Sequence, residues 1–450
     1  MNKRTFLKTT SLLAGGAMLS RLGACSPAPR KEQLQNWAKN LTYSTGNVHV
    51  PKNLQQVQEV VKQCKKLKAL GSRHSFNTIA DSKDNLLSLE ALNKVVTLDK
   101  AVNTVTVESG MRYGELAPFL HDNGYALHNL ASLPHITIAG ACVTATHGSG
   151  IKNGNLSTAV SAIEWVDARG EVVTLSKKKD GDKFNGAVVA LGATGIVTKV
   201  TLDLQPAFDM KQVVYRNLPI EELKNNFNAI QSAGYSVSLF TDWKNKNINE
   251  VWIKSRVNGD QTVAPAELFG ATAATQNMHP VEDQSAESVT EQMGVPGPWY
   301  ERMPHFKMGF RPSTGKELQS EYFVPVEYAY EAIMAMEKLH EKITPHLFIS
   351  EIRTIQADTL WMSPCYKQSC VAIHTTWKQE ADTVMNLLPL IEEQLEPFHP
   401  RPHWAKLFTL TPAVLQSRYE KLHDFKQLVH QYDPEGKFKN DFLTLNIYST

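Results

Sequence analysis

Two segments rich in glycine and small hydroxyl residues, each carrying histidines, constrain this chain more than any other feature. The first spans Ala69 to Asn77 (ALGSRHSFN), and the second spans Ala131 to Gly150. Such residues let successive backbone N–H groups approach an anion closely and form a nest for phosphate oxygens. Neither segment fits a Walker loop or the G-x-G-x-x-G fingerprint. Each alone is typical of a plain turn, but the pair indicates a phosphate-bearing ligand.

Both segments lie in a region that alternates β-type runs with helical patterns. Helical spacing of apolar residues after Asn53 predicts a helix, whose buried face is Val57, Val60, Val61, Cys64 and Leu67. We expect hairpins over 96–107, turning at Asp99 and Lys100, and over 162–175, and a half-buried strand over 196–204. Farther on, the patterns predict strands at 237–240 and 250–253, a helix over 328–339 and a long loop over 258–304. The chain therefore has an α+β pattern.

The pair of segments resembles the PCMH-type FAD-binding domain of the vanillyl-alcohol-oxidase superfamily. The resemblance implies that the first loop wraps the FAD pyrophosphate and that His74 bonds covalently to the 8α-methyl carbon of the flavin. A neutral imidazole is a competent nucleophile for that bond. No cysteine stands between Ala131 and Ile138, so we expect a single covalent link. Arg73 replaces the glycine expected there, at little cost if its φ is negative, and its charge could help near the pyrophosphate.

The resemblance also implies FAD contacts that are largely main-chain. They fall on Gly71, Ser72, Arg73, His74, Ser75, Ser132, Thr137, Gly140, Thr144, Ala145, Thr146, His147 and Ile196. A length of 450 residues suits two domains. The implied plan is an FAD-binding domain over 37–206, an α+β substrate (cap) domain over 207–416, and a segment over 417–450 that returns to the FAD domain near Asp433, Phe438 and Asn440.

Ionisable residues recur at alternating positions in two strand-like runs. Glu351 and Arg353 would face one side of their strand, as would His374 and Thr376 of the next run. Such a face cannot be a dry core unless each group is paired. It is therefore either a substrate site or a buried structural network, for example a pair of Glu351 with Lys406.

Within the superfamily, the chain most resembles the bacterial alditol (xylitol or sorbitol) oxidases, over residues 350–364, 371–377 and 401–408. The resemblance implies polyol-binding residues Ser132, Glu351, Arg353, Thr376 and Lys406, and catalytic residues Glu351, Arg353, His374 and Lys406. Arg353 and Lys406 would hold the reacting C1 hydroxyl and stabilise developing alkoxide charge. Either His374 or Lys406 would take the proton, and the sequence leaves that choice open.

The implied activity is oxidation of a primary hydroxyl of an alditol to the aldose, with hydride passing to FAD. O2 or another electron acceptor would then reoxidise the flavin, giving H2O2 in the case of O2. One alternative is a sugar-1,4-lactone oxidase or dehydrogenase, and another is a non-catalytic sugar-binding lipoprotein that retains FAD. The joint presence of Glu351, Arg353, Lys406 and Ser132 favours the open-chain polyol.

The first 25 residues have the layout of an export signal, with Lys3, Arg4 and Lys8 before an apolar stretch too short to span a bilayer. The run 3–8 resembles a twin-arginine motif, and Leu22 to Cys25 resembles a lipobox, with Cys25 as the acylated residue. An ordinary cleaved signal is the alternative. Residues 26–36 would form a tether, so we expect an exported protein anchored at the bacterial cell envelope, whose membrane contact is the lipid alone.

The net charge and the spacing of the cysteines exclude two further classes of function. A net charge of +2 argues against nucleic-acid binding, which normally shows a basic surplus. Besides Cys25, the spacing of Cys64, Cys142, Cys365 and Cys370 matches no metal site, so no metal is expected. Cys365 and Cys370 could form a local disulfide, although packing of small residues is the favoured interpretation.

Overall fold

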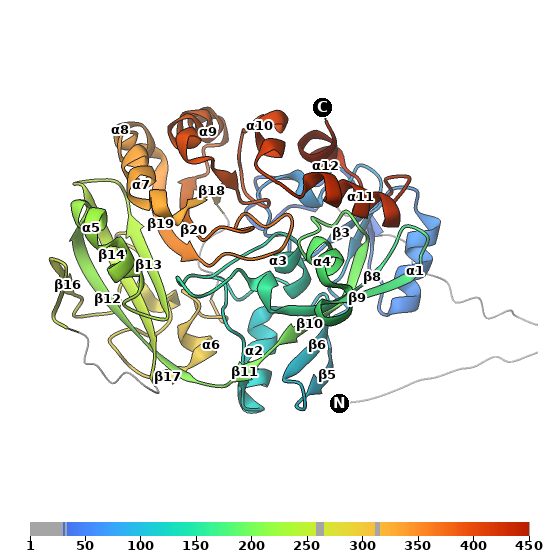
Figure 1. Cartoon of the computed structure of the whole chain (residues 1–450), viewed down its shortest axis with the longest axis horizontal. Coiled ribbons are helices and arrows are strands. Elements are labelled where there is room, and N and C mark those ends of the chain that lie inside the picture. The colour runs from blue at the N-terminus through green and yellow to red at the C-terminus, as the bar shows by residue number, and fades with distance from the viewer. Residues whose placement is uncertain (1–29, 32–33, 258–264, 311–315, 450) are drawn as a thin grey trace, which may run out of the picture.

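A computed structural model describes residues 30–31, 34–257, 265–310 and 316–449. The expected signal, Cys25 and much of the tether lie outside these residues. Within them helices and strands combine as the predicted α+β fold, with the large sheet on the left of Figure 1 and the N-terminal sheets on the right. No helix in the described ranges has the length and apolar character needed to cross a membrane.

The N-terminal region contains a four-stranded sheet of order β1-β2-β4-β3 and a five-stranded sheet of order β5-β6-β10-β8-β9. Their strands are β1 (Arg30–Lys31), β2 (Asn47–His49), β3 (Lys68–Leu70), β4 (Leu86–Ser88), β5 (Val95–Asp99), β6 (Thr104–Glu108), β8 (Val160–Val166), β9 (Val172–Ser176) and β10 (Ile196–Asp203). The short strands β7 (Tyr125–Ala126) and β11 (Gln205–Pro206) pair with each other. The helices are α1 (Leu54–Gln63), α2 (Tyr113–Asp122), α3 (Ile138–Val143) and α4 (Lys177–Val188).

The local predictions for this region are confirmed. The Asn53 side chain accepts a hydrogen bond from Gln56 N at 3.0 Å and caps α1, which buries Val57, Val60 and Val61. Cys64 and Leu67 of the predicted face lie beyond the end of the helix and are buried in the same cluster. Both hairpins form, and the first turns over residues 100–103 because Asp99 pairs with Thr104. The predicted strand at 196–204 is β10.

The large sheet has the order β15-β16-β12-β14-β13-β19-β20-β18-β21, and β17 pairs with β12. Its strands are β12 (Asp209–Pro219), β13 (Ser236–Thr241), β14 (Asn247–Arg256), β15 (Glu267–Leu268), β16 (Ala271–Ala273), β17 (Gly297–Pro298), β18 (Glu317–Pro325), β19 (Leu347–Ile355), β20 (Cys370–Lys378) and β21 (Arg401–Pro402). The helices of this region are α5 (Leu223–Gln231), α6 (Trp299–Arg302), α7 (Ala329–Glu337), α8 (His340–Ile343) and α9 (Ala381–Leu395). The strands predicted at 237–240 and 250–253 lie in β13 and β14, and the predicted helix is α7. The described part of 258–304 contains short strands and α6 rather than one continuous loop.

Strand alternation gives the large sheet one apolar face and one polar face. Tyr322 of β18, Ile352 of β19 and Ile373 of β20 belong to a core cluster shared with buried residues of α5, α7 and α9. The residues between them along each strand therefore point to the opposite face. That face carries the charged groups of the candidate site.

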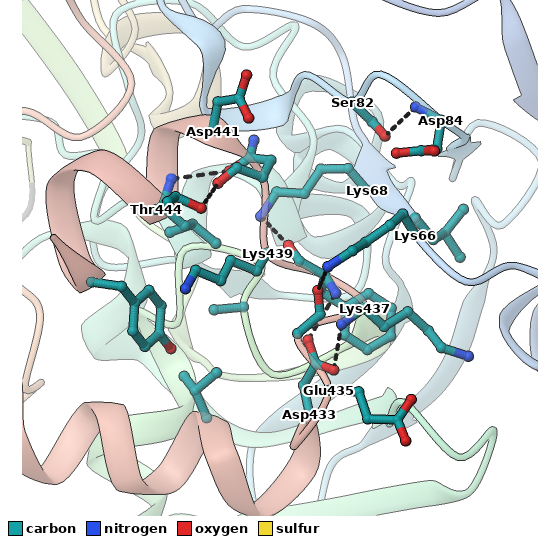
Figure 2. A pocket seen from close by; sticks show the side chains of 18 of the residues that line it. Lys66, Lys68, Ser82, Asp84, Asp433, Glu435, Lys437, Lys439, Asp441 and Thr444 are labelled. Atoms are coloured by element: carbon teal, nitrogen blue, oxygen red, sulfur yellow. Dashed lines mark hydrogen bonds between the residues drawn. The ribbon is translucent and has the colours of Figure 1, made fainter.

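The C-terminal segment packs on the N-terminal region. It contains α10 (Pro412–Ser417), α11 (Leu422–Tyr432), α12 (Asp441–Leu443) and a π-helical turn (Thr444–Tyr448). Phe425 and Val429 share a core cluster with Trp165 of β8. Asp433 accepts hydrogen bonds from the backbone N–H groups of Lys437 and Phe438 at 2.6 and 2.7 Å, and Figure 2 shows this turn. The exact domain boundaries stay a prediction.

The turn at Asp433 forms one wall of a cavity of about 810 Å³, whose walls carry lysines and carboxylates of both regions (Figure 2). Several of these charges already have protein partners. Lys66 Nζ donates to Gly436 O at 2.6 Å, and Lys68 Nζ donates to the carbonyls of Leu191, Gly192 and Phe438. These contacts hold the C-terminal segment on β3.

Candidate active site

A second cavity, of about 900 Å³, lies between the two Gly-rich loops and the polar face of the large sheet. The predicted cofactor residues that line it are Gly71, Ser72, Arg73, His74, Ser75, Ser132, Thr137, Gly140, Thr144, Thr146 and His147. The predicted substrate and catalytic residues Glu351, Arg353, His374, Thr376 and Lys406 line it as well. Ala145 and Ile196 do not: Ala145 is buried with φ of 54°, and Ile196 packs in the core against α1.

The two loops are joined to each other around Thr137. Thr137 N donates to Ser72 Oγ at 3.1 Å. A Cβ added at Gly71 would lie 2.7 Å from Thr137 Oγ1 and would push the two loops apart, and one added at Gly140 would lie 2.8 Å from the same atom within the second loop. No described protein atom accepts a hydrogen bond from the backbone N–H groups of residues 72–75. A run of exposed amide donors fits the pyrophosphate of an FAD.

Arg73 departs from the expected backbone conformation. Its φ is 63°, in the left-handed region, so the condition for a low cost of replacing glycine is not met. A non-glycine residue there costs about 1–2 kcal/mol. The exposed side chain donates to Gln35 O at 3.3 Å, and Arg73 O accepts from Trp37 N at 2.8 Å. The N-terminal contacts therefore support a strained position that turns the loop around the cavity.

His74 is held in a form suited to nucleophilic attack. Its ring stacks on Trp37 with centroids 5.0 Å apart. Burial, followed by the charges of His135, Arg112 and Arg73, lowers the pKa of His74 from 6.5 to about 3. The imidazole is therefore neutral at neutral pH, and a nitrogen lone pair is available.

The charged face of the sheet comes from a row of residues across three strands. Glu351 of β19 and Glu321 of β18 both pair in register with His374 of β20. We call Glu321, Glu351, Arg353, His374 and Lys406 the ion cluster. Arg353 Nη2 donates to Glu321 Oε1 at 2.8 Å, Arg353 Nη1 donates to Ser132 Oγ at 3.2 Å, and Arg353 Nε lies 3.4 Å from Glu351 Oε1.

Lys406 completes the cluster from a loop that both regions fix in place. Its Nζ lies 2.8 Å from Glu321 Oε2 and 2.7 Å from His374 Nδ1. The loop bonds to β18 through Leu407 N and Gln319 O at 2.9 Å, and Asn77 Nδ2 donates to Lys406 O at 2.7 Å. The loop that carries His74 is thus bonded directly to the loop that carries Lys406.

His374 has a defined tautomer. Nδ1 accepts from Lys406, so the proton is on Nε2, which donates to Thr376 Oγ1 at 3.0 Å. Burial and the neighbouring Lys406 hold the pKa of His374 well below its ordinary value. Burial lowers the pKa of Lys406, and Glu321 opposes that shift. Both ring nitrogens of His374 are therefore occupied, whereas Lys406 keeps one hydrogen-bonding direction open.

Glu351 is bound by a residue that the sequence patterns did not single out. His305 Nε2 donates to Glu351 Oε1 at 2.7 Å, while His305 Nδ1 accepts from Lys254 Nζ at 3.0 Å. Burial and Lys254 lower the pKa of His305 to about 4, and the opposing charge of Glu351 does not reverse the shift. Burial raises the pKa of Glu351, but Arg353 and His305 hold it well below the ordinary range. Glu351 is therefore a carboxylate.

The pairing suggested for Glu351 and Lys406 is wrong. Lys406 pairs with Glu321, and Glu351 pairs with Arg353 and His305. Glu317, Gln319 and Glu321 alternate with less polar neighbours and all line the cavity, so the period-two pattern could have found Glu321. His305 follows an irregular stretch that carries no such signal.

Two other expectations concern groups outside the ion cluster. Cys365 and Cys370 are free and buried, which agrees with packing rather than a disulfide. Among the described residues, no group of three or more His, Cys, Asp or Glu side chains could hold a metal ion.

Two segments of this chain match models of known protein families, and the chain as a whole is similar to known oxidases. Residues 47–176 match the model of an FAD binding domain, and residues 312–446 match that of D-arabinono-1,4-lactone oxidase. The chain is 43% identical to the alditol oxidase of a Streptomyces species, over 91% of this chain and 97% of that protein. It is 27% identical to L-gulonolactone oxidase of Mus musculus, over 92% of this chain and 98% of that protein. Cholesterol oxidase of B. sterolicum has a similar fold, with a TM-score of 0.74 at 15% identity over 94% of this chain and 100% of that chain. The chain therefore belongs to the family of FAD-dependent oxidoreductases that includes alditol oxidase and the sugar-lactone oxidases, within the vanillyl-alcohol-oxidase superfamily.

Proposed function

We propose that this protein oxidises the primary hydroxyl of an open-chain alditol, such as xylitol or sorbitol, to the aldose. One observation carries the proposal: a single cavity joins the amide-lined loop at 72–75 to Ser132, Glu351, Arg353 and Lys406. A polyol offers several hydroxyls, each of which both donates and accepts hydrogen bonds. The cavity supplies a carboxylate acceptor and cationic donors within one wall, as such a substrate requires.

The side chains divide the work according to their geometry. Arg353, held by Glu321 and Ser132, donates to the C1 oxygen and stabilises the charge that develops on it. Glu351 accepts from the neighbouring hydroxyls, and the Thr376 hydroxyl binds farther along the chain. FAD, held by the amide-lined loop at 72–75, would supply the acceptor for the hydride of C1, and its reoxidation by O2 would give H2O2.

The proton of the C1 hydroxyl passes to Nζ of Lys406. His374 is the less suitable acceptor, because Lys406 and Thr376 occupy its two ring nitrogens. Burial lowers the pKa of Lys406 and so increases the fraction of neutral amine, the form that a general base requires. Once the proton has been transferred, Glu321 stabilises the ammonium at 2.8 Å.

A substrate and acceptor screen tests the proposal. Purified protein loaded with FAD is offered xylitol, sorbitol, shorter polyols and aldono-1,4-lactones, and both H2O2 and reduction of a dye are recorded. The proposal expects turnover of polyols with stoichiometric H2O2. Preference for lactones would establish the alternative suggested by the gulonolactone oxidase relative, dye reduction without H2O2 would indicate a dehydrogenase, and no turnover would indicate a non-catalytic binder.

We propose further that the FAD is bonded covalently to His74. The support is a neutral imidazole at the cavity wall, stacked on Trp37 and adjacent to the free amides of the loop. The holoprotein is denatured in acid and run on a gel, where yellow fluorescence should stay with the polypeptide. His74→Ala should release it, and Ser75→Ala is a matched control that should retain it. Free FAD in the supernatant of the denatured wild-type protein would contradict the claim.

We also propose that the protein is exported and anchored at the cell envelope through acylated Cys25. The support is the basic start, the short apolar stretch and the lipobox-like run that ends at Cys25. Periplasmic or extracellular polyols would then reach the enzyme without entering the cell.

A further inference from the structure

The polyol chemistry leaves one buried carboxylate without direct contact to the substrate. Glu321 has no exposed side-chain surface, and three basic side chains from separate segments meet at it. Arg353 Nη2 and His147 Nε2 lie 2.8 and 3.2 Å from Oε1, and Lys406 Nζ lies 2.8 Å from Oε2. Burial by itself raises the pKa of Glu321, but Lys406, His147 and Arg353 hold it well below the ordinary value. Glu321 is therefore an anion inside the protein.

The position of Glu321 follows from the alternation of β18. Tyr322, the next residue, faces the opposite side, where its hydroxyl donates to Glu392 at 2.7 Å in the core. Glu321 faces the cavity, opposite His374 on β20. The charged or titratable groups around it are Arg353 and Glu351 of β19, His374 of β20, Lys406 and His403 of the following loop, and His147 of the second Gly-rich loop.

We infer that Glu321 is a positioning residue, which holds Lys406 and Arg353 in one orientation at the substrate end of the cavity. The inference rests on the proposed function, because that function places the reacting hydroxyl between the amine of Lys406 and the guanidinium of Arg353. Without the carboxylate, Lys406 and Arg353 would face each other as like charges, and Arg353 already lowers the pKa of Lys406 while Glu321 raises it. Glu321 thus opposes both the repulsion and the loss of the lysine proton.

Substitution of Glu321 should have different effects if its ion pairs only stabilise the fold than if it positions Lys406. A structural carboxylate affects the free energy of unfolding and leaves kcat/KM of the folded protein unchanged, although at 2.8 Å it too would shift the titration of Lys406. A positioning residue changes kcat/KM of the folded enzyme as well as the titration of Lys406, while the flavin stays bound. Glu392 is a matched control, because it is also a buried carboxylate. It accepts a hydrogen bond from Tyr322, the residue next to Glu321, but lies on the core side of the sheet.

The test compares E321Q, E392Q and the wild-type holoprotein. In each, Lys406 is trace-labelled by reductive methylation across pH, with read-out by mass spectrometry, and kcat/KM for a polyol is measured. In E321Q the midpoint of Lys406 labelling should move to lower pH, and kcat/KM should fall by about 100-fold with FAD retained. E392Q should lower Tm without moving the labelling midpoint or kcat. An E321Q protein that folds and retains FAD but has wild-type kcat/KM, or one with an unchanged labelling midpoint, would overturn the inference.

Two further variants test the role of Glu321 independently of E321Q alone. If E321Q does not fold, E321D preserves the charge but shortens the side chain, so it should keep the labelling midpoint near that of wild type and still lose turnover. In a K406M background, E321Q should reduce kcat/KM much less than it does in wild type, since the two residues act as a unit. Additive losses would contradict the inference. If the wild-type protein oxidises no polyol, the proposed function fails, whereas the labelling midpoints of E321Q and E321D still test whether Glu321 holds Lys406.

Discussion

Replacement of Lys406 by methionine separates a catalytic role from a structural one. Methionine keeps much of the apolar stem and removes the ammonium. The lost contacts are those to Glu321 Oε2 at 2.8 Å and to His374 Nδ1 at 2.7 Å. Removing the partner of a buried ion costs about 3–5 kcal/mol of unfolding free energy when the remaining charge is left unpaired.

Glu321 is not left unpaired in this variant. Arg353 remains at 2.8 Å and His147 at 3.2 Å, so the carboxylate keeps two of its three basic neighbours. We therefore expect Lys406→Met to lower the free energy of unfolding by about 1–3 kcal/mol, the magnitude of one charged hydrogen bond. If Lys406 takes the proton in the transition state, kcat/KM should fall by about 100-fold or more, equivalent to ~2.7 kcal/mol.

Unfolding in urea, followed by tryptophan fluorescence, measures the first quantity. Anaerobic stopped-flow reduction of the bound flavin by polyol measures the second without interference from O2. Lys199→Met is the control, because Lys199 is a partly buried lysine of β10 that pairs with Glu164 at 3.0 Å and does not line the cavity. A Lys406→Met protein that unfolds far more easily, yet reduces its flavin at the wild-type rate while folded, would refute the catalytic assignment.

Three other perturbations have defined outcomes. Burial and Lys254 lower the pKa of His305 from 6.5 to about 4 in the folded protein, so between these pH values the unfolded chain binds one more proton than the folded protein, and the free energy of unfolding falls by at most about 3 kcal/mol as pH drops from 6.5 to 4. The difference in urea stability between wild type and His305→Gln should therefore be smaller at pH 4.5 than at neutral pH. A difference that does not change with pH would contradict this prediction. Gly140→Ala places a Cβ 2.8 Å from Thr137 Oγ1 and should reduce the flavin content per polypeptide, measured by absorbance, whereas Gly309→Ala, where no atom lies within 4 Å, should not. Cys25→Ser should yield soluble protein or unprocessed precursor, and a wild-type protein that never incorporates labelled fatty acid would replace the lipid anchor by simple secretion.

Local patterns determined much of the architecture. The helix after Asn53, both early hairpins and the strands that carry Glu351 and His374 follow from apolar periodicity and turn residues, which act over a few neighbouring positions. The same patterns, together with the resemblance to known flavoproteins, indicated the two Gly-rich loops and a set of site residues that all line the cavity except Ala145 and Ile196. The left-handed backbone of Arg73 does not follow from the sequence, because contacts of its carbonyl with Trp37 and of its side chain with Gln35 accompany a conformation that local preference disfavours.

Tertiary structure decided which charges meet. Strand alternation places Glu351 and Arg353 on one face wherever their strand lies, so the sequence by itself determined that a polar face exists. It did not determine the partners, because β18, β19, β20 and the loop of Lys406 come together only through sheet order and register. Glu321 became the centre of the cluster, and His305 the partner of Glu351, because burial requires every charge to find a nearby counter-charge or hydrogen bond. That requirement is satisfied in space, among segments that are distant in sequence.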